Sequence, residues 1–277
     1  MSSPHVAGSA ALMKALHPTW TPFEIKSALM MSSKTTNLLK EDETTPADAF
    51  DFGAGRVDLS AAAKAGLVLN ETGTNFESAN LADNGDVTTL NIASMQNNAC
   101  VGSCSWTRTF TNVADVSAQY ARTDLTAWLD VSPTSFTLNP GETEIVTFTA
   151  NTDTMVVDEW TFGSVVFEST ETFTTGESIS AAHLPIAVMA SNGNLPKSVA
   201  KDIYRDSGAV VLSDLLATEI TDLSTTVYGL VKAVPQTINL LKDPTNSEVY
   251  DDLDQVFYTT FEVTPGTKRI VAEILDT

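Results

Sequence analysis

The chain has 277 residues, 43% of them hydrophobic, so it can bury a substantial core, and its length predicts more than one domain. Its 15 basic and 35 acidic residues give a net charge of −20, which repels phosphate groups and argues against nucleic acid as a partner. Because no uninterrupted apolar run reaches about 18 residues, we expect no membrane-spanning segment.

Helices are predicted in the N-terminal part of the chain. Residues 1–12 are rich in small side chains at helical spacing and predict a tightly packed helix that ends at His17-Pro18. Thr21-Pro22-Phe23-Glu24 combines an N-cap threonine, a proline at the first helical position and a capping-box glutamate, so a second helix begins there. Asp58 caps a short alanine-rich helix, which we expect Gly66 to close.

From Val68 onward the pattern changes to short runs rich in Val, Thr, Phe and Tyr, separated by turn residues. Such runs are typical of an all-β sandwich of the immunoglobulin or fibronectin kind. The predicted strands are Val87–Ala93, Trp106–Asn112, Ala118–Leu125, Phe136–Leu138, Thr143–Ala150, Thr161–Phe167 and His183–Ala190.

A linker-like segment, Asn192-Gly-Asn-Leu-Pro196, follows the sandwich. Beyond it, strands are predicted at Ala209–Leu212, Thr226–Val234, Gln255–Val263 and Arg269–Leu275. We therefore predict a mixed fold in three parts, namely a helical part at residues 1–67, a sandwich at 68–192 and a second, incomplete β-rich domain at 193–277.

The two cysteines, Cys100 and Cys104, flank a short turn and favour a small disulfide in an oxidising compartment over free thiols. The histidines, His5, His17 and His183, are scattered without metal-ligand spacing, so no metal site is predicted.

Ser2 and Ser3 lie near His5, so a serine nucleophile with a histidine base is conceivable from the residues alone. Hydroxyls at a helix start normally cap backbone N–H groups, however, and no acidic partner for His5 is identifiable. The structural interpretation is therefore favoured for all three side chains.

The opening Met1-Ser-Ser-Pro-His-Val-Ala-Gly8 resembles the second half of the nucleophile motif of the subtilisin-like serine proteases (subtilases, peptidase family S8), Gly-Thr-Ser-Met-Ala/Ser-Ser/Thr-Pro-His-Val-Ala-Gly. The resemblance continues through His17-Pro-Thr-Trp-Thr-Pro22, Ile25-Lys-Ser-Ala-Leu29 and Phe52-Gly-Ala-Gly-Arg-Val-Asp58, in the family's order. Residues 1–67 thus resemble the last helices of a subtilase α/β catalytic domain. The following sandwich resembles the fibronectin type III-like module of many large secreted subtilases.

In that motif the nucleophilic serine precedes the methionine, so it maps one position before Met1, outside this chain. The remnant of the motif here, to which the resemblance gives a structural role, comprises Met1, Ser2, Ser3, Pro4, His5 and Gly8. Because the family orders its triad Asp, His, Ser along the chain, the other catalytic residues would lie upstream too. The resemblance implies a fragment without catalytic residues or cofactor, from a secreted endopeptidase that cleaves polypeptides.

The competing interpretation is a secreted, non-enzymatic β-sandwich protein for adhesion or carbohydrate binding. Trp106, Trp128 and Trp160 could form a sugar-stacking platform, but tryptophans in sandwich strands more often fill the core. We assign them no binding role.

Overall fold

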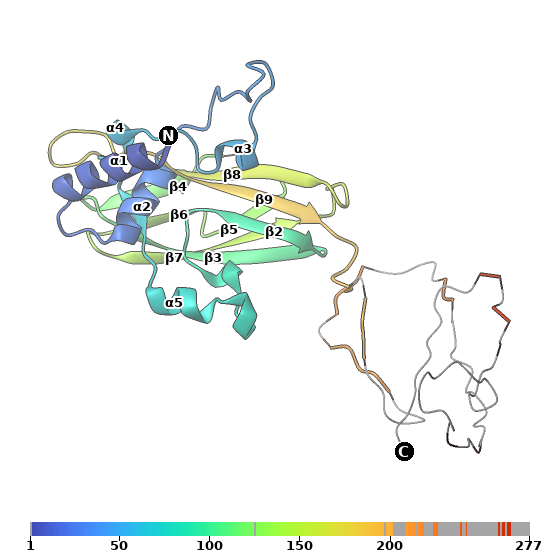
Figure 1. Cartoon of the computed structure of the whole chain (residues 1–277). Coiled ribbons are helices and arrows are strands. Elements are labelled where there is room, and N and C mark those ends of the chain that lie inside the picture. The colour runs from blue at the N-terminus through green and yellow to red at the C-terminus, as the bar shows by residue number, and fades with distance from the viewer. Residues whose placement is uncertain are drawn as a thin grey trace. The chain divides into compact units, whose positions relative to one another are not determined.

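The computed structural model describes most of the chain up to residue 218 and isolated positions after it. The described residues are 2–124, 126–196, 198–201, 209–213, 215–218, 224–226, 239, 242, 260, 262–263 and 265–266. The chain forms two compact units, residues 1–221 and residues 222–277. The fold described below is that of the first unit, which contains all the labelled helices and strands (Figure 1).

The helices lie between residues 2 and 89 of the described chain. They are α1 (Ser2–Leu16), α2 (Pro22–Met31), α3 (Ala49–Phe52), α4 (Leu59–Ala62), α5 (Gly73–Ser78) and the short 3₁₀ helices η1 (Leu81–Asp83) and η2 (Val87–Thr89). The capping box predicted for α2 is confirmed, since Thr21 Oγ1 accepts from Glu24 N and Thr21 N donates to the Glu24 carboxylate. Asp58 caps α4, as predicted.

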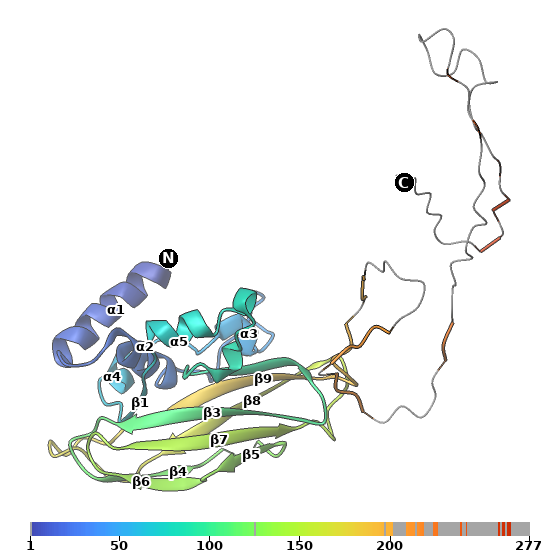
Figure 2. The same ribbon diagram turned by 90° about the horizontal axis from the view of Figure 1, so that it is seen from below.

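The strands form two sheets that pack face to face (Figure 2). The four-stranded sheet has the order β1 (Leu67–Leu69), β3 (Ser103–Asn112), β7 (Thr143–Asn151), β5 (Leu129–Ser132). The five-stranded sheet has the order β2 (Met95–Cys100), β9 (Ala182–Ala190), β8 (Trp160–Glu168), β4 (Ala118–Arg122), β6 (Ser135–Leu138). Only the β2–β9 pair is parallel among the strand pairs of the described chain.

The core between the sheets comes from alternating inward positions of both layers. Phe110 and Phe148 of one sheet meet Phe136 and Phe167 of the other, and the rings of Phe110 and Phe167 lie 5.5 Å apart, edge to face. Inward positions of β7 are buried and alternate with less buried ones, the period of two expected of a strand with one buried face.

Six of the predicted strands are confirmed with shifted ends, namely those observed as β3, β4, β6, β7, β8 and β9. The predicted strand at Val87–Ala93 is wrong. Asp86 accepts from Thr88 N and caps η2, and the strand starts only at Met95. This side-chain cap offers the backbone an alternative to a sheet ladder, so the β-like composition is overridden.

The strand predicted at Ala209–Leu212 is also wrong, because these residues have no regular secondary structure. The strand predicted at Arg269–Leu275, and most of those predicted at Gln255–Val263 and Thr226–Val234, lie outside the described residues. The domain boundaries after residues 67 and 192 stay predictions.

The helical segment, defined as residues 2–66, lies on one side of the strands (Figures 1 and 2). The strand β1 joins it to the sandwich, because Leu67 and Leu69 enter the core between the sheets while Val68 enters a second core with the helices. That second core contains Met13, Trp20, Ile25, Ala28, Leu29, Ala62, Ala65 and Val68.

Gly66 does not close α4 as predicted, since α4 ends at Ala62. A Cβ at Gly66 would lie 2.5 Å from Ile179 and 2.6 Å from the hydroxyl oxygen of Tyr120. The residue is therefore a glycine because the backbone entering β1 passes too close to the sandwich for any side chain.

Candidate functional site

The nucleophile-motif remnant occupies the first turns of α1. Met1 lies outside the described residues, and Ser2, Ser3, Pro4 and His5 are all exposed. The carbonyl of His5 accepts a 2.7 Å hydrogen bond from Ser9 Oγ, one turn further along the helix. The remnant thus lies at the exposed N-terminal end of the helical segment (Figure 1).

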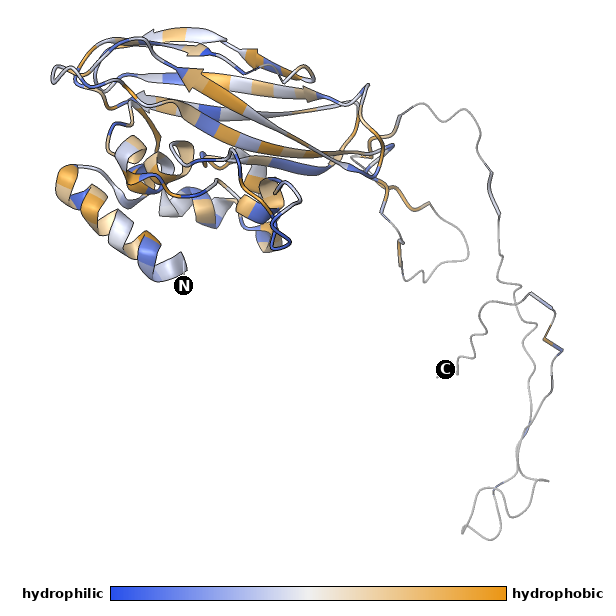
Figure 3. Ribbon diagram, turned by 90° about the horizontal axis from the view of Figure 1, so that it is seen from above, coloured by the Kyte–Doolittle hydropathy of each residue, from blue (hydrophilic) through white to orange (hydrophobic). Residues whose placement is uncertain are grey.

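Most of α1 has no packing partner among the described residues. Only Ser9 and Met13 of this helix are buried, whereas Val6, Leu12 and Leu16 are 45%, 63% and 56% exposed. A Cβ built on Gly8 would have no atom within 4 Å. Figure 3 shows hydrophobic residues, in orange, at intervals along the helix that starts near the N-terminus. An apolar, small-residue helix that leaves this much of its surface exposed normally packs against further protein.

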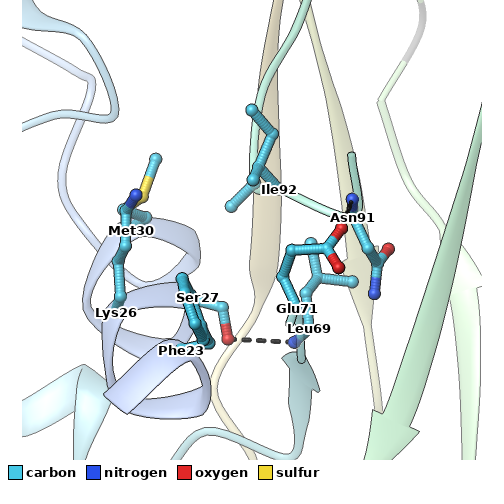
Figure 4. Close-up of a pocket in the computed structure, with 9 residues that line it drawn as sticks. Phe23, Lys26, Ser27, Met30, Leu69, Glu71, Asn91 and Ile92 are labelled. Atoms are coloured by element: carbon cyan, nitrogen blue, oxygen red, sulfur yellow. Dashed lines mark hydrogen bonds between the residues drawn. The ribbon is translucent and has the colours of Figure 1, made fainter. Parts of the chain in front are cut away.

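The small cavity beside α2 does not have the size of a substrate site (Figure 4). Its volume is about 10 Å³, the space of roughly one water molecule. It is lined by Phe23, Lys26, Ser27, Met30, Leu69, Glu71, Asn91, Ile92 and Ala93. Ser27 Oγ accepts from Leu69 N at 2.9 Å across it, a bond that fixes α2 to β1.

The buried carboxylate of Glu71, near this cavity, binds groups of the surrounding chain. Glu71 is 6% exposed, and its carboxylate accepts from Asn91 N, Thr72 N and Asn75 Nδ2. Burial raises the pKa of Glu71, but these hydrogen bonds and the charge of Arg108 together bring it below its ordinary value. These partners are two main-chain N–H groups and one side-chain amide of the same chain, so the carboxylate is structural.

Arg108 is only 2% exposed and donates to main-chain carbonyls around residues 88–94. Its Nε bonds Ile92 O at 2.6 Å and its Nη2 bonds Ser94 O at 2.7 Å, while Nη1 bonds Thr107 O at 2.7 Å. Burial lowers the pKa of Arg108 to about 10, against the opposing influence of Glu71. The guanidinium therefore connects the segment before β2 to β3 by hydrogen bonds.

Two histidines outside the motif are engaged with main-chain carbonyls. His17 stacks on Trp20 with ring centroids 3.8 Å apart, and its Nε2 lies 3.3 Å from Ala63 O. His183 Nε2 lies 2.8 Å from Ala54 O. Burial is the main cause that lowers the pKa of both rings. These contacts hold loops and helices in place.

Cys100 and Cys104 form a disulfide with a Cα–Cα distance of 5.5 Å. The loop between them accepts hydrogen bonds from both chain segments that leave the sandwich at this end, since Ser191 N donates to Cys100 O and Thr152 N donates to Gly102 O. The disulfide loop thus closes one end of the sandwich.

The tryptophans of the sandwich are packed against protein. Trp106 is buried in the core, and Trp128 packs against that core beneath Gly163. Trp160 meets the ring of Phe50 edge to face at 4.8 Å.

Within the described residues, no group of three or more His, Cys, Asp or Glu side chains could hold a metal ion. None of the described helices is long and apolar enough to cross a membrane.

A sequence model of the subtilase family matches residues 1–55. Over these residues the chain is therefore similar to the subtilase family. The region of subtilase sequence contains α1, α2 and α3, so the exposed apolar helix α1 is the subtilase motif helix.

Similarity to curated subtilases reaches beyond this region. The chain is 32% identical over 200 residues to Subtilisin-like protease SBT2.5 of Arabidopsis thaliana, which covers 60% of this chain and 24% of that relative. It is 38% identical over 100 residues to Subtilisin-like protease SBT4.3 and 45% identical over 76 residues to Subtilisin-like protease SBT3.11 of the same plant, covering 36% and 25% of this chain and 13% and 10% of those relatives. The chain thus spans about a quarter or less of the length of these relatives.

Similarity to solved structures is too low to identify a fold family. A Caenorhabditis elegans MSP-domain-like protein, SSP-19, matches with a TM-score of 0.28 at 10% identity, covering 35% of this chain and 95% of that one.

Proposed function

We propose that this chain is the C-terminal part of a secreted subtilisin-like serine endopeptidase and that it has no hydrolytic activity alone. One observation carries the proposal, namely that the helix α1, which has the subtilase motif sequence, leaves the apolar side chains Val6, Leu12 and Leu16 exposed. A catalytic domain built around that helix would cover these side chains.

In the full-length enzyme, hydrolysis would proceed through an acyl-enzyme formed by serine, histidine and aspartate residues upstream of Met1. Ser2 and Ser3 would not act as nucleophiles. The 15-residue helix α1 would contribute its N-terminal end, where main-chain N–H groups and the helix dipole favour negative charge on a neighbouring reacting oxygen. This chain would therefore support the site without performing a chemical step.

The sandwich would serve as a fibronectin type III-like scaffold outside the cell. A disulfide between Cys100 and Cys104 suits an oxidising compartment. The packing of α2 against β1 and the contact of His183 with Ala54 support a scaffold that orients the helical segment.

A non-enzymatic adhesion or carbohydrate-binding function is less well supported. Stacking of sugars needs exposed, flat aromatic faces, but Trp106 is buried and Trp160 packs on Phe50.

Labelling with a serine-directed fluorophosphonate tests the proposal. We expect no labelling of this chain, and stoichiometric labelling that disappears in Ser2→Ala or Ser3→Ala would refute the placement of the motif. A longer chain that includes the upstream coding sequence should be labelled at the serine one position before Met1. If the upstream sequence contains no Gly-Thr-Ser in frame, the non-enzymatic interpretation prevails.

A further inference from the structure

The outer face of the five-stranded sheet carries a buried histidine at its contact with the helical segment. Along β9, Ala182, Leu184 and Ile186 point into the core, so His183, between Ala182 and Leu184, points outward. It is nevertheless only 9% exposed, because α2 and the turn at residues 53–55 cover this part of the sheet.

The imidazole of His183 connects the helical segment to the sandwich. Its Nε2 lies 2.8 Å from Ala54 O, and Ala54 O also accepts a 2.5 Å bond from Ser33 Oγ just after α2. One side chain of β9 therefore holds the turn that Ser33, just after α2, also contacts.

That turn has little freedom to follow a moving ring. Gly55 has a φ of +121°, and a Cβ there would lie 2.6 Å from Lys34 O. The main chains of Lys34 and Arg56 are also paired by two hydrogen bonds of 2.9 Å. If the contact of His183 with Ala54 breaks, the turn cannot re-form it by a local adjustment.

No carboxylate compensates a charge on the ring. The helical segment presents the carbonyl of Ala54 and the Ser33 hydroxyl, and the register partner on β8 is Val166. Burial lowers the pKa of His183, main-chain hydrogen bonding raises it, and the net direction is downward without any contribution from a charged group. The docked state therefore keeps the ring neutral.

We propose that His183 is a proton-operated latch that holds the helical segment on the sandwich at neutral pH and releases it in acid. In the docked state the neutral ring donates its one N–H to Ala54 O. A second proton would add a charge within a nearly water-free contact, whereas in the released state water solvates the charged ring. Acid therefore favours release, independently of the function proposed above.

The expected size of the effect follows from proton linkage. A released His183 with the ordinary pKa near 6.5 binds a proton below that pH, whereas the docked ring, whose pKa is lowered, binds one less readily. The released fraction is therefore constant above about pH 7.5 and grows as pH falls through 6.5, by up to about tenfold at pH 5.5.

Hydrogen exchange of the α2 amides measures this release in the intact chain. Protection factors are compared between pH 7.5 and 5.5, because they remove the intrinsic pH dependence of exchange. We expect the protection of α2 to fall by up to about tenfold in the wild-type chain. His183→Gln, which keeps an N–H donor but does not titrate, should show a flat response.

The matched control is His17→Gln, since His17 also has a lowered pKa and lies in the same helical segment. This variant should keep the full pH response if His183 is the latch. A flat response in His17→Gln, or an unchanged response in His183→Gln, would overturn the proposal.

If His183→Gln does not fold, the proposal is tested by an NMR titration of the histidine ring protons in the wild-type chain. The spectrum of His17→Gln serves to assign the ring signals. Protonation of His183 should coincide with the loss of α2 protection. Protonation near pH 6.5 with α2 still protected would contradict the latch.

Discussion

Replacing Arg108 by methionine removes the donor that holds residues 88–94 on β3. The guanidinium makes three hydrogen bonds of 2.6–2.7 Å and one of 3.4 Å to main-chain carbonyls, and its side chain is 2% exposed. Methionine restores part of the apolar packing but leaves these carbonyls and the Glu71 carboxylate without their cation. We expect a loss of about 3–5 kcal/mol in the free energy of unfolding, as found when one partner of a buried charge arrangement is removed.

Urea unfolding at neutral pH, followed by tryptophan fluorescence, measures this loss as a lower midpoint with an unchanged slope. Arg108→Lys keeps the charge but cannot span the same carbonyls, so it should fall between the wild type and Arg108→Met. In the double variant Arg108→Met with Glu71→Gln, the uncompensated carboxylate is gone, and the combined loss should be smaller than the sum. A loss below about 1 kcal/mol in Arg108→Met would refute a central role for this side chain.

Three further predictions concern the helical segment and its connection. Limited proteolysis should cut α1 before α2, because α1 is largely exposed while α2 buries Ile25 and Leu29; equal rates would contradict this order. Gly66→Ala should lower the free energy of unfolding, measured with urea, by about 1–3 kcal/mol because its Cβ clashes with Ile179. Wild-type stability of this variant would show that the sandwich side chains move to accommodate the Cβ at little cost. Because the pKa of Glu71 is lower in the folded chain than in the unfolded chain, its ionised carboxylate stabilises the fold above the unfolded-state pKa, and this stability is lost as pH falls through the folded-state pKa. Glu71→Gln should therefore show a shallower decline of the free energy of unfolding in acid than the wild type. A decline parallel to that of the wild type would rule this out.

Locally encoded elements were predictable from the sequence. The capping box of Thr21 and Glu24 involves residues three apart, and the inward positions of β7 alternate along one strand. The motif remnant at the start of α1 was recognisable for the same reason, since it is a contiguous string of residues.

Features that depend on distant partners were not predictable. Gly66 reads as a helix terminator, but its absence of a side chain is required by Ile179 and Tyr120. Nothing near His183 indicates that its ring would face Ala54, because the two residues are 129 positions apart. β1 and β9 give α2 a packing surface that only the fold reveals.

The separation of 129 residues between Ala54 and His183 also has a consequence for the order of folding. The helical segment is synthesised before the sandwich, yet the strand it docks on, β9, is the last strand of the sandwich in the described chain. The apolar face of α2 must therefore wait, exposed, until the sandwich is almost fully synthesised. Such late, long-range contacts slow folding and leave aggregation-prone intermediates, so chaperones should bind mainly to the helical segment during synthesis.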